Sequence, residues 1–192
     1  MNEGVDSEFQ ERPRAPGELR FVQAFVNTRD LDRGTDRLDA PAGLAAWLRE
    51  AGLPGADDVS PTGLDRAVRL REAFRRALES NAHLDSGDAT HQLSAAAAGI
   101  PMRVVGSAAG PRVEPAGDGL DAALGALLAT AATATADGSW VRLKVCRNDA
   151  CRWAYWDGSR NRSGVWCTMA VCGNRFKGRA FRRRQSVSAA PD

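Results

Sequence analysis

Apolar residues recur three and four positions apart in five segments of the first 136 residues, as on one face of an α-helix. Phe21 and Phe25 mark this spacing in the first segment. Gly52 stands where a left-handed residue closes a helix, and Ser60 followed by Pro61 is typical of a helix start. The pattern predicts helices from about residue 18 onward and over 41–51, 61–81, 89–98 and 120–136.

Two short segments between the helices predicted over 89–98 and 120–136 favour β-structure instead. Residues 102–105 and 112–114 are rich in β-prone side chains. Gly106 and the pair Gly110-Pro111 separate them, which predicts a small hairpin. Residues 30–41 are charged and show no period, so we expect a loop there.

A further strand is expected near residue 143. Val141, Leu143 and Val145 alternate with basic residues, a pattern typical of a half-buried strand, and the next residue is Cys146. Together with the helices, these elements predict an α+β protein that is mostly α-helical. Its helical N-terminal body would contain one small hairpin.

Composition divides the chain into four parts. Residues 1–17 are polar with two prolines and are expected to form a disordered leader. Residues 18–138 form the helical body, residues 139–184 a C-terminal module, and residues 185–192 a disordered tail. Because the body has a helical core of its own, we expect it to keep most of its helicity when the C-terminal module unfolds.

Charge separates the body from the C-terminal module. Up to Gly138 the chain has 14 Arg against 21 Asp and Glu, a net charge of −7. From Ser139 onward it has 12 Arg and Lys against 3 Asp, a net charge of +9. An acidic body followed by a basic module indicates that the module attracts anions.

Composition also argues against membrane and secreted classes. The 192 residues are 43% hydrophobic and 26% charged, a balance typical of globular proteins. No apolar run approaches the ~20 residues that cross a bilayer, and the charged N-terminus does not resemble a secretory signal. We therefore expect a cytoplasmic protein with no membrane partner, whose thiols stay reduced.

Four cysteines fall in two pairs of equal spacing. Four residues separate Cys146 from Cys151, four separate Cys167 from Cys172, and fifteen lie between the pairs. This is the sequence shape of a tetrahedral Zn²⁺ site, and four thiolates fill the coordination shell, so the site would be structural. Two disulfides or four unrelated thiols are the alternatives. We predict one structural zinc per chain.

The residues around the cysteines predict how the module folds. The stretch from Trp153 to Trp156 is typical of a strand, and Asp157-Gly158 of a turn. A helix is expected after the last pair, with Cys172 in its first turn. A knuckle, a hairpin and a helix in this order resemble a treble-clef zinc finger.

The motifs of this module resemble the CGNR zinc-finger family. Cys-x4-Cys is followed by an aromatic-Asp-x-Ser-Arg-Asn stretch and then by Trp-Cys-x-Met-x-x-Cys-Gly-Asn-Arg. The matching residues are Trp153, Tyr155, Asp157, Ser159, Arg160, Asn161, Trp166, Cys167, Met169, Cys172, Gly173, Asn174 and Arg175. The family usually has basic residues before the Trp-Cys step, whereas this chain has Gly164-Val165.

The N-terminal part resembles the ABATE domain that precedes the finger in that family. The resemblance rests on Phe25-Val26-Asn27-Thr28 and on Trp47-Leu48. It implies a largely helical domain associated with stress-induced transcription regulation, followed by a zinc finger.

Our first functional hypothesis is a transcription regulator that binds DNA through the basic module. Clustered basic side chains can neutralise phosphates and release counterions. The candidate contacts are Arg160, Arg162, Arg175, Lys177, Arg179 and Arg182. The alternative is that these side chains balance the −2 charge of a zinc bound by four thiolates, or that Arg175 pairs with Asp157.

The second hypothesis is a zinc-stabilised module that binds a protein or senses a small molecule without binding DNA. Asn27, Thr28 and Asp30 are polar residues at the end of an apolar helix and are candidates for lining an effector pocket. Side chains that satisfy the helix terminus are the alternative reading. A homo-oligomer is compatible with both hypotheses. We expect no enzymatic activity, because no His lies near the cysteines and only Asp149 and Asp157 could serve as a general base there.

Overall fold

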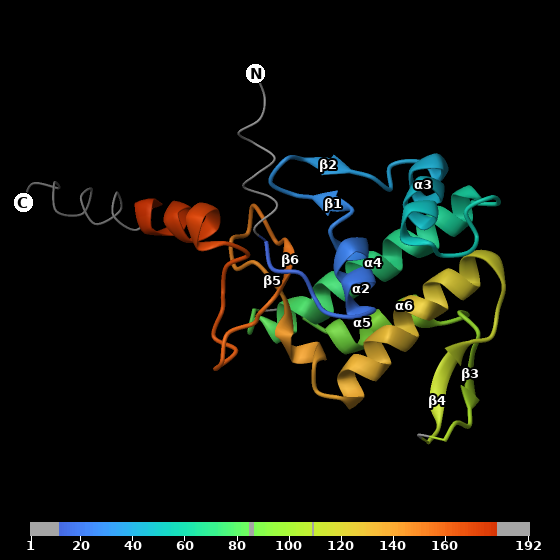
Figure 1. Cartoon of the computed structure of the whole chain (residues 1–192). Helices are drawn as coiled ribbons and strands as arrows, with labels where there is room; N and C mark the ends of the chain where they lie inside the picture. The colour runs from blue at the N-terminus through green and yellow to red at the C-terminus, as the bar shows by residue number, and fades with distance from the viewer. Residues whose placement is uncertain (1–11, 85–86, 109, 180–192) are drawn as a thin grey trace, which may run out of the picture.

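The computed structural model describes residues 12–84, 87–108 and 110–179 (Figure 1). Its helices are α2 (Leu19–Val26), α3 (Pro41–Ala51), α4 (Pro61–Asn81), α5 (Ala89–Ala97) and α6 (Gly119–Ala136). Its strands form the antiparallel pairs β1–β2 (Arg29–Asp30, Thr35–Asp36), β3–β4 (Met102–Val105, Arg112–Pro115) and β5–β6 (Leu143–Val145, Ala154–Trp156). A 3-10 turn (Trp140–Arg142) precedes β5, and a π-helical turn (Met169–Gly173) leads into helix at 174–179. The predicted α+β, mostly helical class is confirmed.

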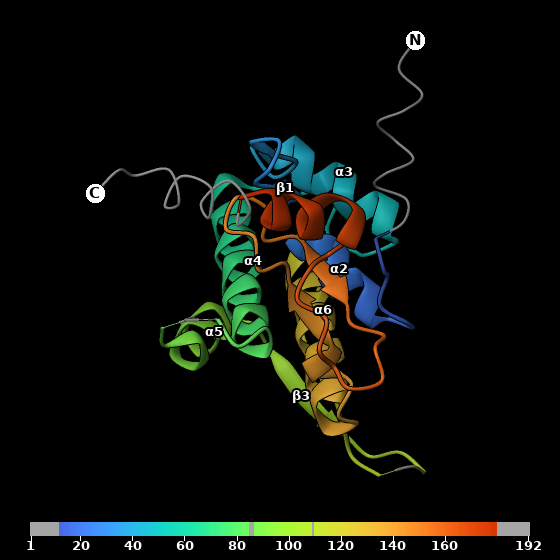
Figure 2. The same cartoon turned by 90° about the vertical axis from the view of Figure 1, so that its left-hand side faces the viewer.

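The longest helix, α4, is the centre of the body. It packs against α2, α3, α5 and α6, and also against β5. Figures 1 and 2 show α4 and α6 running alongside each other with α2 against both, while the β3–β4 hairpin lies against α6 at the far end. The finger, from β5 onward, contacts α4 and α2, and Figure 1 shows it on the side of the helical body away from the β3–β4 hairpin.

Local sequence signals place the helix ends of the body. Gly52 closes α3 in the left-handed conformation with φ +68°. The Ser60 hydroxyl accepts a hydrogen bond of 3.0 Å from the Gly63 amide at the start of α4. Both caps were predicted, because each depends on a single side chain and its immediate neighbours.

The charged segment after α2 is more ordered than predicted. Instead of a loop it forms the short β1–β2 hairpin. Asp36 at its end forms a two-pronged ion pair with Arg71 of α4, at 2.6 and 2.8 Å, and Arg71 is fully buried. Partial burial raises the pKa of Asp36, but Arg71 lowers it further, so the net shift is downward. This long-range pair, which no local pattern shows, fixes the hairpin on the body.

The predicted disordered leader is wrong for residues 12–17, while residues 1–11 lie outside the described residues. Arg12 and Ala15 are buried. The carbonyl of Pro13 accepts hydrogen bonds from the Trp156 amide at 3.1 Å and from the Gln23 side chain at 2.9 Å. The segment pairs with the edge of β6, and this contact orders it. The predicted tail, 185–192, also lies outside the described residues.

The β5–β6 hairpin of the finger belongs to the hydrophobic core of the body, while the cysteines form a second, smaller cluster beside it. Leu143, Val145 and Ala154 of the β5–β6 hairpin are fully buried in the cluster built by α2, α3, α4 and α6. Asn81 of α4 donates hydrogen bonds of 2.9 Å to the carbonyls of Trp140 and Leu143. This arrangement argues against the prediction that the body keeps its helicity when the module unfolds.

The burial of Lys144 in β5 also differs from the prediction, because the alternating pattern of this strand places Lys144 on an exposed face. Its side chain is only 4% exposed, and its ammonium lies 2.7 Å from a carboxylate oxygen of Asp157. It also donates to the carbonyl of Arg162. The loop between residues 157 and 164 covers this face of the strand, so both faces of β5 are buried.

The sequence-based statement that no apolar run approaches the length of a membrane span does not hold for α6: within the described residues, this helix is long and apolar enough to cross a membrane by length and composition alone. Helices in the cores of globular proteins share these properties. Here the helix packs against α2, α4 and β4, and six of its residues are buried. One third of the helix is therefore buried inside the fold.

Candidate metal centre

The four cysteines meet in one buried cluster. Cys146 follows β5, Cys151 ends the turn before β6, Cys167 precedes the π-helical turn, and Cys172 lies within that turn. Their sulfur atoms all lie within 4.8 Å of one another, and all four cysteines are free of disulfides. The grouping is the one that the spacing predicted.

The sulfur geometry fits a tetrahedral zinc ion. Four sulfurs around a zinc with bonds of about 2.3 Å lie about 3.8 Å apart. The separations Cys151–Cys167 and Cys167–Cys172 are both 3.8 Å. Four thiolates leave no open coordination position, so the residues fit one structural zinc, which would supply folding free energy.

Each thiol of the cluster changes the pKa of its neighbours. The neighbouring thiols raise the pKa values of Cys151 and Cys167, and burial adds to both shifts. The same contacts lower the pKa of Cys172, with help from the amide of Asn148. Four anionic sulfurs so close together repel one another, and a bound divalent cation removes that cost.

Asn148 and Arg179 support the cluster from outside the ligand set. The Asn148 amide lies 3.7 Å from the sulfur of Cys172 and is buried. Arg179 donates a hydrogen bond of 3.1 Å to the side-chain oxygen of Asn148, which orients that amide toward the sulfur. Partners of this kind fix ligand geometry at metal sites. Arg179, predicted as a DNA contact, is thus engaged beside the metal site.

Aromatic residues cover the cluster. Tyr155 is buried among the cysteines, and Trp153 and Trp166 pack against them. The Tyr155 hydroxyl donates a hydrogen bond of 2.7 Å to the Gly164 carbonyl. The aromatics of the finger therefore build its small core and shield the sulfurs from water.

The predicted DNA contacts occupy different environments. Arg160 and Arg162 are exposed on the loop after Asp157, and Lys177 is exposed on the C-terminal helix. Arg175 forms a two-pronged ion pair with Asp32 of the β1–β2 turn, at 2.8 Å to each oxygen. The alternative prediction that Arg175 pairs with Asp157 is wrong, because the Asp157 carboxylate binds Lys144 instead. Arg182 lies outside the described residues, and the DNA role of the whole set stays a prediction.

The predicted effector-pocket residues are engaged within the protein. The Asn27 side chain accepts from the Ala154 amide at 2.8 Å and donates to its carbonyl at 2.9 Å. Thr28 donates to the Phe25 carbonyl at 2.7 Å, and Asp30 accepts from the backbone amides that follow it. Thr28 and Asp30 thus satisfy the helix end and the hairpin turn. Asn27 also lines a cavity described below.

The sequence reasoning did not single out a hollow of about 820 Å³ on the finger. It lies between the first cysteine knuckle and the C-terminal helix and includes Arg147 and Lys177. Phe176, which is 50% exposed, and Trp166 line it with ring centroids 5.0 Å apart. Lys177 and Arg179 of its lining were predicted as DNA contacts, whereas Arg147 and Phe176 were not.

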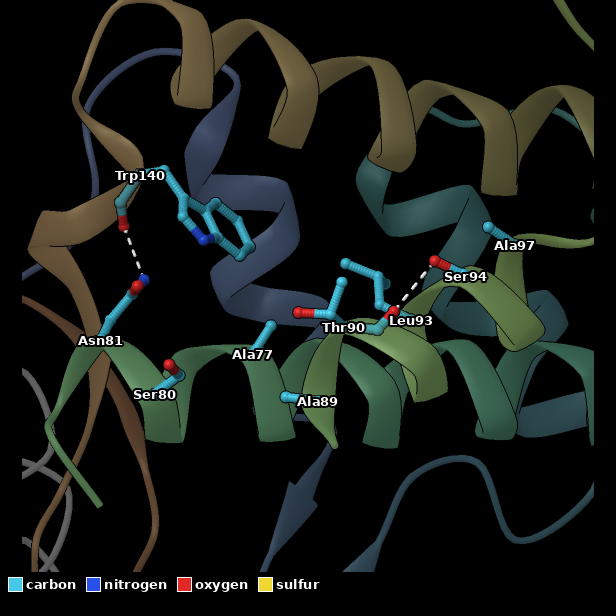
Figure 3. A pocket seen from close by; sticks show the side chains of 9 residues that line it. All are labelled: Ala77, Ser80, Asn81, Ala89, Thr90, Leu93, Ser94, Ala97 and Trp140. Carbon is cyan, nitrogen blue, oxygen red and sulfur yellow. Dashed lines mark hydrogen bonds between the residues drawn. The ribbon is translucent and has the colours of Figure 1, made fainter. Parts of the chain in front are cut away.

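A second hollow, of about 380 Å³, lies between α4 and α5 (Figure 3). It is lined by Ala77, Ser80, Asn81, Ala89, Thr90, Leu93, Ser94, Ala97 and Trp140. Figure 3 shows the Asn81 side chain bound to the Trp140 carbonyl at 2.9 Å, with the Trp140 ring facing the hollow. None of the described residues that line it is charged, so it offers no group that selects an ionic ligand.

A helical body joined to a four-cysteine finger with this geometry defines a zinc-finger protein. Residues 142–185 match the CGNR zinc finger. Residues 19–138 match the ABATE family, described as "Putative stress-induced transcription regulator". The second match covers more than half of the chain, and the chain therefore belongs to the ABATE family. A comparison with curated proteins gives no match.

Proposed function

We propose that this chain is a cytoplasmic, non-enzymatic transcription regulator that binds DNA through its finger. The family description and the zinc-finger match support regulation of transcription in general. The observation that carries DNA binding is the set of exposed basic side chains on the finger. These are Arg147, Arg160, Arg162 and Lys177, in a segment with a net charge of +9.

The hollow beside the first knuckle is the surface best suited to nucleic acid. Arg147 and Lys177 bring positive charge to it, and Phe176 exposes an aromatic face. Basic side chains contact the phosphate backbone of duplex or single-stranded DNA, and an exposed aromatic face can also stack on the bases of a single strand. The filled coordination shell of the cysteines favours a scaffold role for the metal over catalysis.

A salt titration of binding to a short random-sequence duplex tests this function. The variant Arg147→Gln/Lys177→Gln is compared with Arg49→Gln/Arg103→Gln, which removes the same charge from exposed positions on the body. Each lost phosphate contact lowers the slope of log affinity against log salt by about 0.9, so the finger variant should lose about 1.8. Equal losses in both variants, or no binding by the parent at ~50 mM salt, would contradict the proposal.

Arg175 can be tested separately through its partner. Asp32→Asn removes the ion pair that holds Arg175, and Asp39→Asn removes an equal charge from an exposed position nearby. If Arg175 contacts phosphate, Asp32→Asn raises DNA affinity more than Asp39→Asn does. Equal effects would leave Arg175 as a link between finger and body.

The alternative is a protein-binding or sensing module without DNA binding. The exposed Phe176 beside Trp166 is the observation that favours a protein partner. If the parent protein contains zinc but does not bind DNA, this alternative is favoured. Homo-oligomerisation is compatible with either function and is measured by light scattering.

A further inference from the structure

A cavity of about 430 Å³ lies where three parts of the chain meet. Its walls come from the segment before α2, from the stretch that contains α2, Arg37 and α3, and from Trp153, which precedes β6. Figure 1 shows the segment before α2 running next to β6, as the Pro13–Trp156 hydrogen bond requires. Small-molecule sites occur preferentially at junctions between parts of a fold, with volumes of about 300–1,000 Å³.

The lining of this cavity is strongly basic. Its charged residues are Arg12, Arg14, Arg20, Arg37 and Glu50. Arg37 lies 2.8 Å from both carboxylate oxygens of Glu50, so this pair is already neutral. Arg20 lies 3.7 Å from Glu18, but both side chains are more than half exposed and solvent screens the pair. Arg20 also donates to the Gly17 carbonyl at 2.9 Å, a bond that leaves its positive charge in place. The charges of Arg14 and Arg20 at this surface favour an anionic ligand.

Flat surfaces line the same cavity. The guanidinium of Arg12 lies 4.4 Å from the ring centre of Trp153, and that of Arg20 lies 4.4 Å from the ring centre of Phe21. Trp47 adds a second indole, which is 4% exposed and packs on Phe25. Aromatic rings and guanidinium planes both stack on planar groups. The cavity therefore favours a ligand that is planar as well as anionic.

The amide side chains of the lining already have partners. Gln23 bonds to Pro13, Ala15 and Ala154, and Asn27 bonds to the backbone of Ala154. They shape the wall and hold it in place. Recognition of a ligand charge then falls to the arginines at the rim, Arg14 and Arg20.

We propose that this cavity binds a small planar organic anion of the aromatic carboxylate class. Arg14 and Arg20 meet the carboxylate, and the ring of the ligand lies against Trp153 and Phe21. The proposal goes beyond the proposed DNA function and does not depend on it. It gives the effector predicted from Asn27 a chemical class and a place.

The position of the cavity links it to the metal centre. Trp153 lies two residues after Cys151, one of the four cysteines of the metal centre. The amide of the next residue, Ala154, is bound by the side chain of Asn27. A ligand that touches both Trp153 and α2 holds the finger on the body. It therefore slows the local opening through which the finger loses zinc.

Titration of the zinc-loaded protein tests the binding step. The probes are benzoate, the uncharged benzamide and the non-aromatic acetate, followed by the indole N–H signals of Trp47 and Trp153 in two-dimensional NMR. Benzoate should shift both signals and saturate, while benzamide and acetate bind at least ten-fold more weakly. Equal binding of benzamide, or no saturation by about 50 mM benzoate, would overturn the proposal.

Matched variants assign the charge. Arg14→Gln and Arg20→Gln should each weaken benzoate binding about three- to five-fold, as expected for exposed ion pairs. Arg49→Gln changes an exposed arginine of α3 outside the cavity and should leave binding unchanged. If all three variants weaken binding equally, the net charge of the protein attracts benzoate and the cavity does not bind it.

A chelator tests the link to the finger. Zinc loss to EDTA is followed by tryptophan fluorescence with saturating benzoate or with the same concentration of acetate. Benzoate should slow the loss at least two-fold in the parent and should have no effect in Arg14→Gln/Arg20→Gln. An unchanged rate in the parent would overturn the link between cavity and finger.

Discussion

Asp157 connects the parts of the finger that do not bind the metal. Its carboxylate accepts hydrogen bonds from Lys144 at 2.7 Å, from the Ser159 hydroxyl at 2.6 Å and from the Gly164 amide at 2.9 Å. A Cβ on Gly164 would lie 2.8 Å from this carboxylate. A side chain at position 164 would therefore crowd the carboxylate in its present position.

The carboxylate of Asp157 is stabilised in its charged form. Burial raises its pKa, but Lys144 and Ser159 lower it further, so the pKa falls from 3.8 to about 2. A group with a lowered folded-state pKa stabilises the fold above its unfolded pKa and loses that contribution as pH falls toward the folded value. Asp157 thus stabilises the finger at neutral pH.

Asp157→Asn tests this residue. It leaves Lys144 buried without its charge partner, which costs about 3 kcal/mol in the free energy of unfolding at pH 7. Asp149→Asn, an exposed control paired with Arg152, should cost under about 1 kcal/mol. Urea unfolding measures both. Because acid releases zinc from thiolates, the pH series is run on the zinc-free proteins. The advantage of the parent over Asp157→Asn should stay constant from pH 8 to 5 and shrink as pH falls from 3.8 toward 2. Equal costs for both variants would show that Asp157 is not the polar centre of the finger.

The sequence could predict the residues whose partners are near in the chain. Cysteine spacing predicts the metal cluster, and Gly52 and Ser60 predict helix ends, because each signal acts within a few residues. Lys144 could not be placed, since its alternation pattern is the same whether a loop covers that face or water does. The Arg175–Asp32 pair joins residues 143 positions apart, and no local pattern encodes it.

At the scale of elements, β6 is held at its edge by side chains of α2. Asn27 forms two hydrogen bonds to the backbone of Ala154, as a neighbouring strand would, and Gln23 adds a third at 3.1 Å. On the other edge, β6 pairs with β5. The helix end thus completes a two-stranded sheet that is otherwise marginal.

Asn27→Ala tests this contact. Loss of the side chain leaves the buried amide and carbonyl of Ala154 without these partners, which costs about 1–3 kcal/mol. Gln92→Ala, at an exposed position of α5, should have little effect. Thermal unfolding gives the stability, and amide exchange at Ala154 should rise in the Asn27 variant alone. Unchanged exchange there would rule out Asn27 as the partner of β6.

At the scale of the whole molecule, the zinc centre and the helical body form one unit. Leu143, Val145 and Ala154 bury themselves among α2, α3, α4 and α6, next to the cysteine cluster. Arg75 of α4 reaches across and donates to the Arg152 carbonyl at 3.0 Å. Composition and charge divide the chain near residue 138, but the core does not, because packing depends on where chain segments meet and not on their average charge.

Removal of zinc tests this unity most directly. The zinc-loaded and EDTA-treated proteins are melted while far-ultraviolet circular dichroism reports the helices and tryptophan fluorescence reports the finger. The shared core predicts that both signals move together to a lower melting temperature when zinc is removed. A helical signal that melts at the same temperature with and without zinc, while the tryptophan signal alone is lost, would contradict it.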